Sequence, residues 1–150
     1  MASRLYIPAL DNLYQPLAPY AGTILRVTMG GILIPHGAQK LFGMFSGPGL
    51  TRMSAIFDQI GYHPGIVWAW TIGLLEFFGG ICLVVGFLTR PVAAALVIFM
   101  MVSIQFTSAK GFFWTAGGLE YSLLILIVGL YFFIRGAGDH SVDQRMAREF

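Results

Sequence analysis

The sequence predicts an all-α membrane protein folded as a four-transmembrane-helix bundle, on the evidence of its composition, its four long apolar runs and the connections between them. Apolar residues make up 57% of the 150 residues, charged residues only 11%, and the mean hydropathy is +0.75. A soluble domain carries many more charges, so the bilayer is the expected environment. Backbone groups in lipid must be hydrogen-bonded within their own segment, which favours helices over strands. We expect residues 1–150 to form a single membrane domain.

Four apolar runs are long enough to cross a hydrocarbon core of about 30 Å, which takes roughly 20 helical residues. They cover approximately residues 20–40, 64–88, 91–109 and 118–135. Only a few residues, around Thr89 to Pro91, separate the second run from the third, which predicts an antiparallel hairpin of these two helices. The first twenty residues contain three prolines and no apolar core, so we expect a short tail at the membrane surface rather than a signal peptide.

The connection between the first and second runs is longer and predicts a short amphipathic helix in the membrane interface. Its apolar residues have helical spacing: Leu50, Met53, Ile56, Phe57 and Ile60. Thr51 is available as the N-cap of this helix. A helix placed there would form a lid over the bundle.

Positive charges near the ends of the runs favour a cytoplasmic position for both termini, because cytoplasmic loops carry an excess of Lys and Arg. The side of the termini would hold Arg4, Arg90, Arg135, Arg145 and Arg148, and the opposite side Lys40, Arg52 and Lys110. Aromatic residues typical of an interfacial belt gather on that opposite side: Tyr62, Trp68, Trp70 and Trp114.

Ionisable residues within the runs are expected to face inward and to pair, because each would cost several kcal/mol in lipid. At a rise of about 1.5 Å per residue, Arg26 lies about 9 Å and Glu76 about 18 Å from the cytoplasmic ends of their helices. Two long side chains can close that gap, which predicts a structural Arg26–Glu76 ion pair. Gly73 and Gly80 flank Glu76 on its face of the helix and would let another backbone approach closely.

A second polar group is expected near the noncytoplasmic face, where His36, Lys40, Gln105 and Glu120 have similar depth. Pro35 can bend the first helix where this group begins. We predict His36 and Glu120 as a proton-exchanging, catalytic pair, since imidazole titrates near neutrality and a carboxylate stabilises its charged form. The predicted ligand-binding residues are Lys40, Gln105, Trp114 and Tyr121. Such a group fits the head of a quinone, although Lys40 also suits an ordinary interface anchor.

Other chemistries are disfavoured by the same sequence. The single Cys82 has no partner for a dithiol, a disulfide or a thiolate metal site. His63 and His140 lie in a linker and in the tail, so neither a b-type haem nor another metal is expected. A net charge of +2 without a basic patch argues against nucleic acid as a partner.

From Ile24 to Asp143 the chain resembles the DoxX family of small bacterial membrane proteins. The resemblance rests on four stretches: "HGAQKLFG" from His36, "LEFFGGICLVVGFLTR" from Leu75, "GGLEYSLLIL" from Gly117 and "GAGDHSVD" from Gly136. Ala137 stands where the closing motif more usually has proline. The resemblance implies a place in the bacterial inner membrane. One branch, DoxD, looks like the membrane subunit of a thiosulfate:quinone oxidoreductase, and other members are tied to oxidative-stress complexes.

The leading functional hypothesis is a membrane redox accessory protein or subunit that binds a quinone-like lipophile in the outer half of the bundle. It would act with a protein partner or as a homo-oligomer, and the sequence leaves open whether the chain is itself an enzyme. Two alternatives remain at this stage. One is a non-catalytic scaffold of a larger membrane complex, and the other is a small transporter, which four short spans without a clear repeat disfavour.

Overall fold

The computed structural model describes residues 6–146, and its regular structure in that range is entirely helical. The longer helices are α1 (Asp11–Phe42), α2 (Gly49–Gln59), α3 (Gly65–Val85), α4 (Thr89–Thr107) and α5 (Glu120–Arg135). Shorter pieces are the 3₁₀ turns η1 (Pro8–Leu10), η2 (Ser108–Lys110) and η3 (Trp114–Ala116), and α6 (Val142–Arg145). Arg4 and Arg148, which enter the orientation prediction, lie outside the described residues.

Three of the predicted spans are confirmed as helices long and apolar enough to cross a membrane: Pro8–Phe42, Gly65–Val85 and Thr89–Lys110. Helix α5 matches the fourth predicted run. Its 16 residues rise only about 24 Å at 1.5 Å per residue, which is less than a typical hydrocarbon core. The count of four spans therefore stays a prediction.

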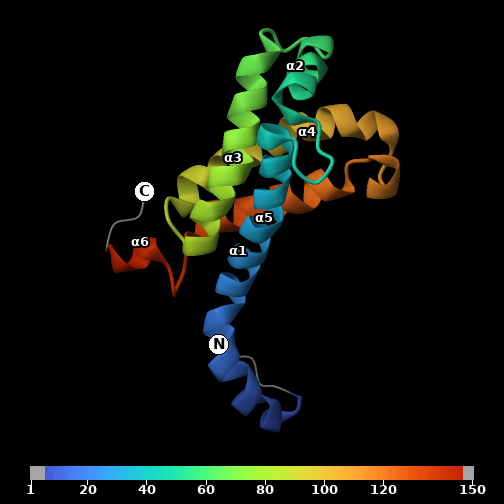
Figure 1. Ribbon diagram of the computed structural model, residues 1–150. Coiled ribbons are helices and arrows are strands. Elements are labelled where there is room, and N and C mark those ends of the chain that lie inside the picture. Colours follow the sequence, from blue (N-terminus) through green and yellow to red (C-terminus); the bar gives the residue numbers. More distant parts are fainter. Residues whose placement is uncertain (1–5, 147–150) are drawn as a thin grey trace.

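Helix α1 begins earlier than the sequence predicts. It starts at Asp11 instead of near residue 20, so most of the predicted surface tail is helical and projects away from the other helices (Figure 1). Pro16 and Pro19 lie inside this helix and each leaves one carbonyl without its usual N–H donor. Residues 11–21 are all exposed, so these carbonyls have access to solvent.

Helices α1 and α3 form the closest pair, and glycines make this possible. A Cβ on Gly30 would lie 2.5 Å from the carbonyl oxygen of Gly80, and one on Gly37 would strike the backbone nitrogen of Phe77. Gly73 likewise receives the side chain of Leu41. The predicted close approach of another backbone is therefore confirmed at Gly80, whereas the neighbour of Gly73 is a side chain.

Helices α4 and α5 form a second pair, which runs across the first in Figure 1. Between the pairs lies a core of buried apolar side chains: Met29, Leu33, Leu83, Ala93, Leu96, Met100, Ile125 and Phe132. The connection from α3 is Gly86–Leu88, so Thr89 to Pro91 belong to the first turn of α4, where proline is tolerated. Because α4 packs chiefly against α5, the predicted antiparallel hairpin with α3 is not the main helix pair.

Helix α2 occupies the linker in which the sequence predicts an amphipathic helix. It begins at Gly49 after Pro48, so Thr51 lies within its first turn and is not its N-cap. The helix packs on the start of α3, where a Cβ on Gly65 would strike the carbonyl oxygen of Ser54. Its location in the membrane interface stays a prediction.

Candidate functional site

The two residues expected to pair, Arg26 and Glu76, each take other partners. Glu76 is 4% exposed on α3 and forms an ion pair with the Nζ of Lys40 on α1. Arg26 is fully buried and donates hydrogen bonds to the carbonyl oxygens of Leu83, Val84 and His140. The predicted Arg26–Glu76 ion pair is therefore corrected to a Lys40–Glu76 pair.

The register of α1 against α3 explains this exchange of partners. Gly30 lies against Gly80, and Leu41 lies against Gly73, so Lys40 faces the part of α3 that carries Glu76. Arg26 lies nearer the N-terminal end of α1 and faces the C-terminal end of α3. The prediction counts depth from the cytoplasmic ends of the two helices, and depth alone does not determine which side chain lies nearest to Glu76.

His36 and Tyr121 lie beside the Lys40–Glu76 pair. Their rings stack with centroids 5.6 Å apart and an angle of 22° between the planes. Glu76 is within electrostatic range of both the His36 ring and the Tyr121 hydroxyl. His36, Lys40, Glu76 and Tyr121 are called the polar cluster below.

Hydrogen bonding gives the two rings of the polar cluster distinct capacities. The Nδ1 of His36 lies 2.8 Å from the carbonyl oxygen of Ile32. A carbonyl only accepts, so Nδ1 donates and the Nε2 of the neutral ring is left as an acceptor. The hydroxyl of Tyr121 is buried and has no hydrogen-bond partner within residues 6–146. One ring therefore offers an acceptor and the other a donor.

An apolar groove of about 140 Å³ runs between α1 and α5 and ends at the polar cluster. Its walls come from both helices: Leu25, Thr28, Met29 and Ile32 of α1, and Tyr121, Leu124, Ile125 and Val128 of α5. Tyr121 belongs to both the groove and the cluster. The groove is therefore apolar and is joined to the polar cluster through Tyr121, and apolar grooves beside polar groups are typical of sites for lipophilic ligands.

The remaining predicted site residues are not brought to His36. Glu120 is the first residue of α5, and its Oε2 accepts a hydrogen bond from the backbone N–H of Trp114 at 3.1 Å. Trp114 is 65% exposed in η3, and Gln105 is exposed near the end of α4. Equal depth therefore does not pair Glu120 or Gln105 with His36, because Glu120 binds the backbone of the preceding turn and Gln105 is exposed. The structure shows no hydrogen bond between His36 and Glu120 in its described part.

A second buried polar group was not predicted, and it gives the closing "GAGDHSVD" stretch a structural role. The carboxylate of Asp143 accepts hydrogen bonds from the backbone N–H groups of Leu88 and Thr89, at 2.9 and 3.0 Å. Its own N–H donates to the carbonyl oxygen of Gly86 at 2.9 Å. These contacts fasten the closing segment to the start of α4, and the bond from Arg26 to His140 fastens it to α1. In the sequence, the signal for this structural role is an acidic residue shortly after the last apolar run.

Comparison with known proteins agrees with this membrane architecture. The DoxX family model matches residues 21–120. An uncharacterized protein of Haemophilus influenzae is 30% identical over 148 residues, covering 93% of this chain and 100% of that protein. An uncharacterized membrane protein of Mycobacterium tuberculosis is 27% identical over 153 residues, covering 94% of this chain and 90% of that protein. No solved structure matches. On the family match, the chain is a membrane protein that belongs to the DoxX family.

Proposed function

We propose that this protein is a membrane subunit that binds the head group of a quinone-like lipophile at the polar cluster and exchanges protons with it. The observation that supports this most directly is the Tyr121 hydroxyl, which is buried without a partner within residues 6–146, on a residue that also lines the apolar groove. A buried hydroxyl without a partner is costly, and a ligand oxygen placed beside it removes that cost.

The donor and acceptor of the polar cluster match the two states of a quinone. The oxidised carbonyl oxygen accepts a hydrogen bond from Tyr121, and the hydroxyl of the reduced form donates one to the Nε2 of His36. Reduction of a quinone takes two electrons and two protons. In this proposal the Nε2 of His36 takes a proton from water and passes it to the ligand, once for each of the two protons, and the electrons come from a partner oxidoreductase. The Lys40–Glu76 pair lies beside the imidazole that gains and loses this proton.

The groove gives the ligand its route. It is lined almost entirely by apolar side chains and lies between two lipid-exposed helices, so a hydrocarbon tail can enter it sideways from the bilayer. We place this site in the noncytoplasmic half of the bacterial inner membrane, with both termini in the cytoplasm, on the charge bias of the span ends.

The test is binding of short-chain ubiquinone and menaquinone analogues to the full-length protein in mild detergent, measured by equilibrium dialysis. We expect Tyr121→Phe and His36→Gln each to weaken binding by about tenfold, the effect of one lost buried hydrogen bond. Matched controls are Tyr62→Phe and His63→Gln, which change the same residue types outside the polar cluster and leave binding unchanged.

Two results would count against the proposal. Absence of binding by the wild-type protein, together with no quinone in its lipid extract, removes it and favours the scaffold alternative. Equal loss of binding in Glu120→Gln and His36→Gln would instead support His36 and Glu120 as the proton-exchanging pair.

A further inference from the structure

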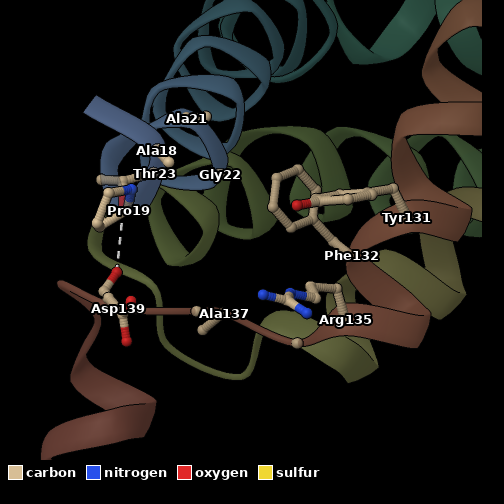
Figure 2. A pocket seen from close by; sticks show the side chains of 12 residues that line it. Ala18, Pro19, Ala21, Gly22, Thr23, Tyr131, Phe132, Arg135, Ala137 and Asp139 are labelled. Carbon is tan, nitrogen blue, oxygen red and sulfur yellow. Dashed lines mark hydrogen bonds between the residues drawn. The ribbon is translucent and has the colours of Figure 1, made fainter. Parts of the chain in front are cut away.

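A second, more polar pocket lies at the other end of the groove between α1 and α5. Its volume is about 170 Å³. Small residues of α1, among them Ala18, Ala21 and Gly22, form one wall, and the end of α5 with the turn Gly136–Asp139 forms the other. Figure 2 shows the side chains around it. The quinone proposal uses none of these residues.

Two polar groups of α5 face this pocket and have no hydrogen-bond or ion-pair partner within residues 6–146. Figure 2 shows the guanidinium of Arg135 and the hydroxyl of Tyr131 pointing into the same space. Neither makes a hydrogen bond or ion pair with the residues that the structure describes. An arginine in this position presents a planar set of N–H donors, which suits a phosphate.

The far end of the pocket is closed by contacts that keep its one carboxylate occupied. The Thr23 hydroxyl donates to the carbonyl oxygen of Asp139 at 3.0 Å. The Asp139 carboxylate accepts from the Nε2 of Gln144 at 3.0 Å and lies apart from Arg135 in Figure 2. Within residues 6–146, Arg135 therefore has no carboxylate partner.

The position of the pocket favours a lipid as the source of that anion. It lies where the apolar run of α1 begins and where α5 ends, which are the levels of lipid head groups. Ile24 follows the last lining residue of α1, and Ile134 directly precedes Arg135. They are 64% and 75% exposed and offer an apolar surface to acyl chains.

We propose that this pocket binds the phosphate of an anionic phospholipid, with Arg135 and Tyr131 as its donors. The acyl chains lie along the outer faces of α1 and α5. A soluble phosphate shares the same head-group chemistry but lacks the chains, which separates the two sources experimentally.

The test is native mass spectrometry of the full-length protein released from detergent with added phosphatidylglycerol, phosphatidylcholine or glycerol phosphate. We expect phosphatidylglycerol to bind at least about tenfold more tightly than phosphatidylcholine, and Arg135→Gln to abolish that preference. Tyr131→Phe weakens binding less. Arg145→Gln, which removes an exposed arginine of the same end of the chain, is the matched control and retains the preference.

Three outcomes overturn the proposal. They are equal binding of the two lipids by the wild-type protein, an unchanged preference in Arg135→Gln at unchanged thermal stability, and binding of glycerol phosphate as tight as that of phosphatidylglycerol. The last would assign the pocket to a soluble phosphate compound.

Discussion

The ring of His36 stacks on the ring of Tyr121 with centroids 5.6 Å apart, and this contact joins α1 to α5 at the end of the apolar groove. It places an imidazole acceptor and a phenol donor on one site, close to the charge of Glu76. The packing of these two rings and the ligand contact that we propose for them can therefore be separated by substitution.

The Tyr121→Phe substitution keeps the stacked ring and removes only the hydroxyl. Because that hydroxyl is buried without a partner, its removal is expected to leave the Tm in detergent unchanged or to raise it. Ligand binding falls at the same time. A marked drop in Tm would show instead that the hydroxyl has a structural partner in the folded protein.

Removal of one partner of the Lys40–Glu76 ion pair is expected to destabilise the folded protein. Lys40→Met leaves the Glu76 carboxylate buried without its cation, which costs about 3–5 kcal/mol in comparable buried pairs. The double variant Lys40→Met with Glu76→Leu removes both charges and is expected to recover most of that loss. Unfolding in a graded denaturing detergent measures both, and additive losses would show that the two side chains do not interact.

The fold was largely predictable because apolar runs of this length leave helices as the only solution in lipid. The partners of the buried charged residues were not predictable. Depth along a helix follows from residue counting, but the partner of Glu76 depends on how far α1 slides along α3. Gly30 and Gly37 set that slide through contacts with residues of α3, which a single sequence does not reveal.

The contacts of polar residues near helix ends were also not predictable from depth along the helix. Glu120 has the depth expected of a partner for His36, yet as the first residue of α5 it binds the backbone of the preceding turn. The structural role of Asp143 was not predictable for the opposite reason. It follows the last apolar run in a short polar tail, and its role depends on the tail folding back to α4.

Gly37 is expected to be intolerant of any side chain. A Cβ there would strike the backbone of Phe77, which cannot move without shifting α3. Gly37→Ala is therefore expected to lower the Tm sharply and to reduce the yield of folded protein. Gly31→Ala is the matched control on the same helix, because nothing lies within 4 Å of its Cβ. That variant is expected to be stabilised by up to about 1 kcal/mol through helix propensity. Equal effects of the two substitutions would contradict the close approach of α1 and α3.

Asp143 is expected to contribute more to stability than its neighbour Asp139. Asp143→Ala leaves two backbone N–H groups at the start of α4 without an acceptor and removes the carboxylate near buried Arg26, for a loss of at least about 2 kcal/mol. Asp139→Ala breaks one exposed bond to Gln144 and is expected to cost within about 0.5 kcal/mol. Thermal unfolding of both variants in the same detergent makes the comparison. A larger loss from Asp139→Ala would contradict the proposed fastening of the closing segment.

The stability of the connection between α2 and α3 is expected to depend on pH through the carboxylate of Asp58. Its carboxylate accepts hydrogen bonds from the backbone N–H of Gly65 at 2.8 Å and from the Nδ1 of His63 at 2.9 Å. The backbone bond from Gly65 is the main cause that lowers the pKa of Asp58 in the folded protein, and the bond from His63 adds to it. A lowered pKa means that folding favours the ionised carboxylate.

The sign of the resulting stability change follows from that direction. The stabilisation is complete above the pKa of an unfolded aspartate, near 3.9, and disappears as the pH falls through the lower folded value. We therefore expect the Tm of the wild-type protein to exceed that of Asp58→Asn at pH 6, and the difference to shrink progressively below about pH 4. His63→Asn isolates the contribution of the imidazole, because it leaves the bond from Gly65 in place. A difference in Tm that stays constant down to pH 2 would mean that ionised Asp58 does not hold the two helices together.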